Sequence, residues 1–195
     1  CAGQRLVVKG QFPAVSDGPF IYMFNHASLL DTFIILSALP EHAGAVGKKA
    51  QFEMPIWGFI LKRWGAISID RRQLNKAIES LNVVEADLMT GLSLLISPEG
   101  TRSNDGRLAP FKKGPFHIAA NTNATIVPLG IDGAYEAKNK GSWVLKPGTI
   151  RLHIGAPISR DEGVDYQMEN LRRLTRERIA QLLPKERTSK GQQES

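Results

Sequence analysis

The chain has 195 residues, of which 42% are hydrophobic and 23% charged, and its formal net charge is +6. This length suits one domain with a single core, and this composition excludes a collagen-like or wholly disordered chain. The positive charge favours an anionic partner, but it is scattered in short basic pairs without a recognisable nucleic-acid module, which disfavours DNA or RNA.

Short runs rich in apolar and β-branched residues predict strands at 6–8, 20–24, 66–69, 92–96, 125–129 and 149–154. Segments 75–89 and 166–183 carry apolar residues along one helical face. Strands that alternate with helices predict an α/β domain in which helices cover the faces of a sheet. Segment 184–195 is polar and aperiodic, so disorder is expected there and a single domain over 1–183.

Segment 51–64 has apolar side chains around nearly the whole circumference of a helix. A helix of that kind is usually buried, so most of these side chains are expected in the core. The alternative is that some of them, above all Trp57 and Trp64, line an acyl-chain groove or dip into a bilayer surface. Lys62 and Arg63 would assist contact with a bilayer.

Several classes of site are disfavoured. Cys1 is the single cysteine, which excludes an intramolecular disulfide and a buried thiol nucleophile.

A chain that begins with Cys1 rather than Met is expected to be a piece of a longer protein. No run approaches the ~20 apolar residues of a transmembrane helix. His42, His117 and His153 lack metal-ligand spacing, and no Gly-x-Ser-x-Gly elbow is present.

The segment 25–31 follows a predicted strand and contains His26 and, five positions later, Asp31. If a helix begins near Ser28, the Asp31 carboxylate can reach back to Nδ1 of His26. Nε2 is then free to accept a proton, as activation of a hydroxyl for attack on an acyl carbon requires. The alternative is that His26 is a buried, hydrogen-bonded loop residue and Asp31 a surface charge.

The segment 98–103 follows another predicted strand and contains Glu99, Gly100 and Arg102. Gly100 permits a tight turn, and the Arg102 guanidinium matches a phosphate group bidentately. Glu99 can hold that guanidinium or bind polar groups of a substrate. The alternative is an exposed polar turn.

In their order and spacing, four segments of the chain resemble the motifs of the glycerolipid acyltransferases. This family includes the 1-acylglycerol-3-phosphate and the glycerol-3-phosphate acyltransferases. The segments are 25–31, 65–71, 99–102 and 126–130, and 111–114 is similar to the stretch that follows the third motif in the lysophosphatidate branch. The resemblance implies a mixed, mostly parallel central sheet covered by helices on its faces.

The resemblance also implies roles for single residues. His26 would be the general base and Asp31 its orienting partner, while Pro128 would shape the acyl-donor side. The residues implied at the substrate phosphate are Arg71, Glu99, Gly100, Thr101 and Arg102, with Lys112 or Lys113 as a further phosphate contact. Whether Arg71 or its neighbour Arg72 faces the phosphate stays open, because successive residues of a strand point to opposite sides.

The implied reaction transfers a fatty acyl group from acyl-CoA or acyl carrier protein to the sn-2 hydroxyl of lysophosphatidic acid. It gives phosphatidic acid in phospholipid biosynthesis, with no metal or other cofactor. The implied location is the cytoplasmic face of a membrane, either peripheral or anchored by an N-terminal segment absent from this chain. Alternatives are another lysophospholipid, a lyso-aminolipid or glycerol 3-phosphate as acceptor, or a catalytically silent phospholipid-binding module.

Overall fold

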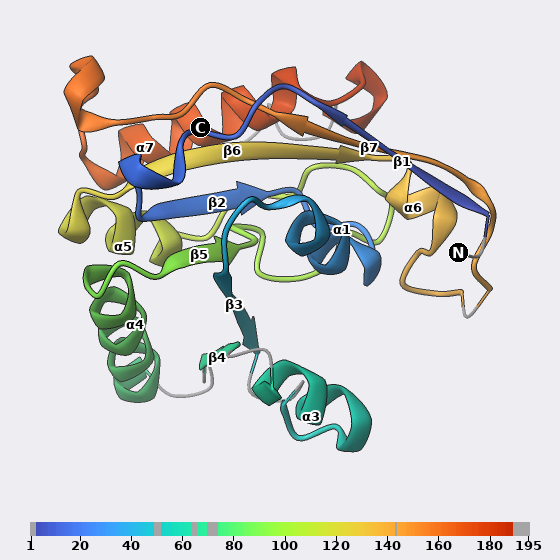
Figure 1. The fold of residues 1–195 in the computed structure, drawn as a ribbon, viewed down its shortest axis with the longest axis horizontal. Helices are drawn as coiled ribbons and strands as arrows, with labels where there is room; N and C mark the ends of the chain where they lie inside the picture. The colour runs from blue at the N-terminus through green and yellow to red at the C-terminus, as the bar shows by residue number, and fades with distance from the viewer. Residues whose placement is uncertain (1–2, 49–51, 64–65, 70–73, 143, 189–195) are drawn as a thin grey trace.

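The structure is a computed structural model that describes residues 3–48, 52–63, 66–69, 74–142 and 144–188. Its strands form one sheet in the order β1-β7-β6-β2-β5-β3-β4 (Figure 1). Among the pairings, only β6 with β7 is antiparallel, which confirms the mixed, mostly parallel sheet. The strands are β1 (Gln4–Lys9), β2 (Phe20–Phe24), β3 (Ala43–Lys48), β4 (Ile67–Ile69), β5 (Ser93–Ile96), β6 (Thr125–Asp132) and β7 (Gly148–Ile154).

Helices cover both faces of this sheet. The α-helices are α1 (Leu30–Ala38), α3 (Pro55–Arg63), α4 (Leu74–Met89), α5 (Gly114–Thr122), α6 (Ala134–Ala137) and α7 (Met168–Gln181). Three short 3-10 helices are η1 (Val15–Asp17), η2 (Arg160–Glu162) and η3 (Lys185–Arg187). None of the helices in the described part of the chain is long and apolar enough to cross a membrane.

The central strand β2 separates two apolar cores. Ile21 and Met23 face a core that includes side chains of α4, α5 and α7. Phe20, Tyr22 and Phe24 face the opposite core, to which α1 and α6 contribute. A parallel strand covered on both faces is apolar at successive positions rather than alternately, as the run 20–24 is.

The six predicted strands are all present, and the helices predicted at 75–89 and 166–183 appear as α4 and α7. The strand β3 was not predicted. Its sequence, AGAVGK, is made of small residues with two glycines, which have weak strand preference. Pairing with β5 on one side and β4 on the other holds this segment in the sheet.

The prediction that most of segment 51–64 lies in the core is wrong for Phe59 and Met54, which are exposed, whereas Phe52, Ile60 and Leu61 are partly buried. Phe59 of α3 is 70% exposed, and Met54, just before this helix, is 53% exposed. The helix lies near β3 and β4, at the end of the sheet, where the described elements leave its outer side uncovered (Figure 1). Trp64 and the side chain of Trp57 lie outside what the structure describes.

Part of the segment predicted to be disordered is ordered. Residues 185–187 form η3, and the Arg187 backbone carbonyl accepts a hydrogen bond of 2.8 Å from the Leu108 N–H. The Arg187 guanidinium pairs with Glu136. Segment 189–195 lies outside the described residues.

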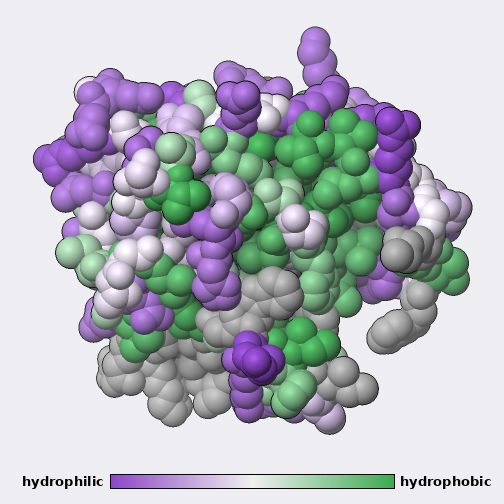
Figure 2. Space-filling model, viewed as in Figure 1, coloured by the Kyte–Doolittle hydropathy of each residue, from purple (hydrophilic) through white to green (hydrophobic). Residues whose placement is uncertain are grey.

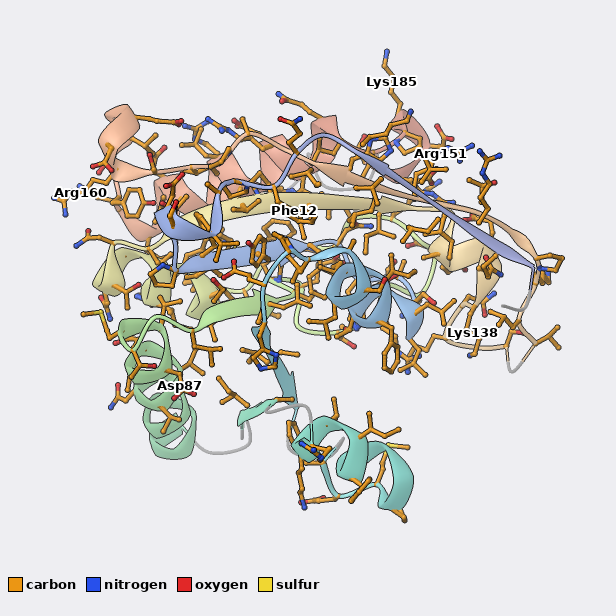
Figure 3. All side chains as sticks on the ribbon, in the orientation of Figure 1. Phe12, Asp87, Lys138, Arg151, Arg160 and Lys185 are labelled. Atoms are coloured by element: carbon orange, nitrogen blue, oxygen red, sulfur yellow. The ribbon has the colours of Figure 1, made fainter. Side chains whose placement is uncertain are left out.

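The basic side chains are distributed over separate parts of the surface. Exposed Arg151, Arg160 and Lys185 come from β7, η2 and η3, and each points away from the sheet (Figure 3). This arrangement agrees with the scattered basic pairs of the sequence.

Candidate active site

The candidate site lies at the carboxyl edge of the sheet, where the neighbouring parallel strands β2 and β5 end. His26 follows β2, and the segment 97–103 follows β5. Loops at the carboxyl ends of parallel strands are the usual place for binding and catalysis in α/β proteins. The strand order therefore brings together two segments that are separated by about 70 residues in the sequence.

His26 and Asp31 form the contact predicted from their spacing. Nδ1 of His26 lies 2.9 Å from Oδ2 of Asp31, whose side chain is 0% exposed, whereas that of His26 is 17% exposed. The same Oδ2 accepts backbone N–H groups of Ala27 and Ser28, each at 2.7 Å. Because a carboxylate only accepts, Nδ1 carries the proton in this pair and Nε2 has a free lone pair.

The second segment holds the backbone of His26 from both sides. The His26 N–H donates to Oε1 of Glu99 at 2.8 Å, and its carbonyl accepts from the Ser103 N–H at 2.7 Å. Together with the Asp31 contact, these bonds fix the backbone and one ring nitrogen of His26. The imidazole is therefore oriented before any ligand binds.

Glu99 is a buried carboxyl group, with 2% of its surface exposed. Its second oxygen, Oε2, accepts the Ala109 N–H at 3.0 Å, so both oxygens are bonded to the backbone. Burial raises the pKa of Glu99 to about 7, and the negative charge of Asp31 adds to this rise. The rise is opposed by the hydrogen bonds from His26 and Ala109 and by the positive charge of Arg176. The sequence had suggested contact with Arg102 or a substrate, whereas the observed partners are backbone groups.

The turn after β5 presents a cation. Gly100 has φ +71°, a left-handed conformation that favours glycine, and its N–H donates to the Ser97 carbonyl at 3.1 Å. The half-buried Arg102 has no hydrogen-bond or ion-pair partner among the described residues. Its guanidinium is thus available to an anion, next to Ser103, which bonds the backbone of His26.

The other residues predicted for the site are distributed differently. Thr101 and the side chain of Lys112 are exposed, whereas Lys113 pairs with Glu169 at 3.1 Å. Pro128 is buried within β6, where it is aligned with Met23 of β2. Arg71 and Arg72 lie outside the described residues.

Sequence reasoning missed the contribution of Asn25. Its buried side chain donates to the Ile131 carbonyl at 2.9 Å and accepts the Ile131 N–H at 2.7 Å. These bonds join the end of β2 to the end of β6 immediately before His26. A buried amide requires partners, but the sequence gives no signal for one 106 positions away.

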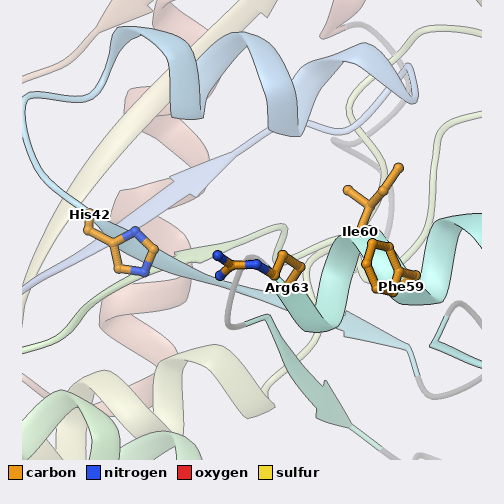
Figure 4. Close-up of a pocket in the computed structure, with 4 residues that line it drawn as sticks. All are labelled: His42, Phe59, Ile60 and Arg63. Carbon is orange, nitrogen blue, oxygen red and sulfur yellow. The ribbon is translucent and has the colours of Figure 1, made fainter.

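An apolar pocket of about 370 Å³ lies between α3 and the residue that precedes β3. Phe59, Ile60 and Arg63 of α3 line it together with His42. Figure 4 shows the Arg63 guanidinium directed toward His42, with Phe59 and Ile60 farther along the helix. Among the residues predicted for the site that the structure describes, none lines this pocket.

The chain is similar to known proteins over most of its length. The family model described as Acyltransferase matches residues 5–132. A 1-acyl-sn-glycerol-3-phosphate acyltransferase of Cocos nucifera is 38% identical over 161 residues, 82% of this chain and 52% of that protein. The alpha enzyme of that name from Mus musculus is 27% identical over 161 residues, 82% of this chain and 56% of that protein.

Among solved structures, the 1-acyl-sn-glycerophosphate (LPA) acyltransferase PlsC of Thermotoga maritima matches with a TM-score of 0.78 and 26% identity. That match covers 92% of this chain and 71% of the other. The chain spans about half the length of the curated relatives it matches.

Because Glu99 is buried, we expect the stability of the folded protein to depend on pH, and we expect Glu99→Gln to remove this dependence. Since its pKa is about 7 in the folded protein against an ordinary 4.5, the folded state binds more protons between these values. Stability therefore falls as pH rises through this window, by about 3 kcal/mol for this group. Urea unfolding of wild type and Glu99→Gln at pH 5 and 8 should show wild type losing about 2.5 kcal/mol relative to the variant, because the first part of the loss occurs below pH 5. A pH-independent difference would contradict the assignment.

Proposed function

The chain belongs to the acyltransferase family, and on this basis we propose that it transfers a fatty acyl group from a thioester to the free sn-2 hydroxyl of lysophosphatidic acid. The donor is acyl-CoA or acyl-acyl carrier protein, and the product is phosphatidic acid for phospholipid biosynthesis. The observation that carries the proposal is the oriented His26–Asp31 pair, with Arg102 in the loop that holds it. The relatives matched by the chain bear the name of this activity.

The reaction proceeds by direct attack. Nε2 of His26 takes the proton of the acceptor hydroxyl while its oxygen attacks the thioester carbonyl carbon, and Asp31 stabilises the imidazolium. The carbon–sulfur bond then breaks, and the departing thiolate takes the proton from His26. Ser28, the hydroxyl nearest along the chain, is fully buried and donates to the Lys138 carbonyl, which argues against an acyl-enzyme on it.

The acceptor phosphate binds at the turn that carries Arg102. A guanidinium makes two parallel hydrogen bonds to phosphate, and the exposed Lys112 adds a second positive charge in the same loop. By its place in the family motif, Arg71 is a further contact of the acceptor phosphate. Pro128 shapes the part of the site that binds the acyl donor. Another lysophospholipid, a lyso-aminolipid or glycerol 3-phosphate would use the same base, so an acceptor panel separates these substrates.

The partner surface is the cytoplasmic side of an anionic bilayer, which would hold the lysophosphatidic acid. The exposed Phe59 and Met54 lie close in sequence to Lys62 and Arg63, also exposed. In Figure 2, hydrophobic and hydrophilic side chains lie together at the position of α3, below a broad hydrophobic area at that of α1. Apolar side chains flanked by cations suit the interface of a membrane with anionic lipids.

Replacing the base tests the reaction. His26→Ala should lower transfer of labelled acyl groups from acyl-CoA to lysophosphatidic acid by about 10²- to 10⁴-fold, because no other group takes the proton. His117→Ala, on an exposed position of α5, is the matched control and should retain activity. Binding without product in the wild type would favour a silent lipid-binding module, and an active His26→Ala would refute the mechanism.

Replacing the phosphate ligand tests acceptor binding. Arg102→Ala should raise KM for lysophosphatidic acid about 10- to 100-fold with a smaller change in kcat, since a charged bidentate contact contributes about 1.5 to 3 kcal/mol. Arg160→Ala, at a distant exposed position, should leave KM unchanged (Figure 3). An unchanged KM for Arg102→Ala would exclude this guanidinium from the phosphate site.

Replacing the exposed phenylalanine tests the membrane contact. Phe59→Ser should weaken binding to phosphatidylglycerol-containing vesicles about 10- to 100-fold, because insertion of a Phe side chain contributes about 1.5 to 3 kcal/mol. Val83→Ser, which also removes an exposed apolar side chain but from α4, is the control. Co-sedimentation measures both variants, and equal binding by Phe59→Ser and wild type would argue against α3 as the contact.

A further inference from the structure

The C-terminal helix α7 lies beyond residues 5–132, which the family model matches, yet one of its arginines reaches the candidate site. Nη1 of Arg176 donates to the Ala109 carbonyl at 2.7 Å, and Nη2 to the Leu108 carbonyl at 3.4 Å. Its guanidinium lies over the Phe111 ring, 5.4 Å from the ring centre. The half-buried cation is therefore held against the segment 108–111 by three contacts.

These contacts continue to the catalytic base. The Ala109 N–H donates to Oε2 of Glu99, and Oε1 of Glu99 accepts the His26 N–H. Ala109 is thus bonded through its carbonyl to Arg176 and through its N–H to Glu99. A continuous chain of hydrogen bonds leads from α7 to the backbone of His26.

We propose that Arg176 is a positioning residue for acyl transfer, which fixes the segment 108–111 and, through Ala109 and Glu99, the backbone of His26. This role rests on the proposed function, because it assigns Arg176 to the reaction in which His26 is the base. Arg176 itself touches neither substrate nor the imidazole. Its effect is therefore expected in turnover rather than in acceptor binding.

The charges around Glu99 make this role measurable. The groups that act on its carboxyl are Asp31, which disfavours ionisation, and Arg176, which favours it, together with the N–H groups of His26 and Ala109. Without Arg176 the pKa of Glu99 rises further above about 7. Protonation turns one oxygen of Glu99 into an O–H donor and removes the negative charge, so the two N–H groups are then bound less strongly than by the carboxylate.

The same helix supplies a matched control. Arg173 is exposed and pairs with Glu177 on α7 at 2.9 Å, without a bond to the segment 108–111. Arg173→Met and Arg176→Met therefore make the same chemical change on one helix, at the surface and at the site. Arg176→Lys keeps the positive charge but removes the guanidinium, which donates to two backbone carbonyls.

The kinetic test measures kcat and KM for acyl-CoA and lysophosphatidic acid between pH 5.5 and 9. Arg176→Met should lower kcat at pH 7 on the order of tenfold, with little change in KM, and should move the acidic limb of kcat to higher pH. Arg173→Met should match wild type, and Arg176→Lys should keep the acidic limb near wild type. An unchanged kcat and pH profile in Arg176→Met, or the same loss in Arg173→Met, would overturn the proposal.

Amide hydrogen exchange of His26, followed by NMR in the same variants, needs no turnover. Protection of this amide should fall about tenfold in Arg176→Met and stay unchanged in Arg173→Met. If Arg176→Met does not fold, the comparison is made with Arg176→Lys, in which a smaller loss of protection is expected and full protection would overturn the proposal. Wild type that transfers no acyl group to any acceptor would defeat the proposed function, whereas equal exchange in both methionine variants would defeat the positioning role.

Discussion

The arrangement of the candidate site depends on the two hydrogen bonds that hold the backbone of His26. Both come from the segment 99–103, through the Glu99 carboxylate and the Ser103 N–H. A general base acts only when its lone pair is aimed at the proton it removes, and a side chain is aimed by its backbone as well as by its ring partner. His26, the proposed base, and the turn with Arg102 are therefore parts of one hydrogen-bonded unit.

Two buried carboxyl groups have different tasks in this unit. Asp31 contacts the imidazole ring and the first backbone N–H groups before α1, while Glu99 contacts only backbone. Burial removes water from Glu99 and so disfavours its charged form. Keeping this carboxyl group ionised near neutral pH therefore reduces the stability of the fold. Such a cost is typical where a site is held ready for a reaction, and the cation of Arg176 offsets part of it.

The proposed membrane contact lies on a different part of the domain. The site is built on β2 and β5 in the middle of the sheet, whereas the exposed side chains of α3 lie near β3 and β4 at its end (Figure 1). Separate elements can thus bind a lipid surface and orient the base. In this proposal the strands hold His26 while the exposed helix contacts the bilayer, so the two requirements do not compete for the same residues.

The sequence by itself determined the strands β2, β5 and β6, because continuous apolar runs can be satisfied only by burial on both faces. It also indicated the His26–Asp31 contact, since a helix that begins between these residues brings the carboxylate near the imidazole, and the structure chose this contact over the alternative of a surface Asp31. Only the tertiary structure decided what Asn25, Glu99 and Arg176 bond to, since their partners lie 106, 73 and 67 positions away. Likewise, β3 and the exposure of Phe59 depend on strand order, and local patterns of polarity do not encode which strands become neighbours.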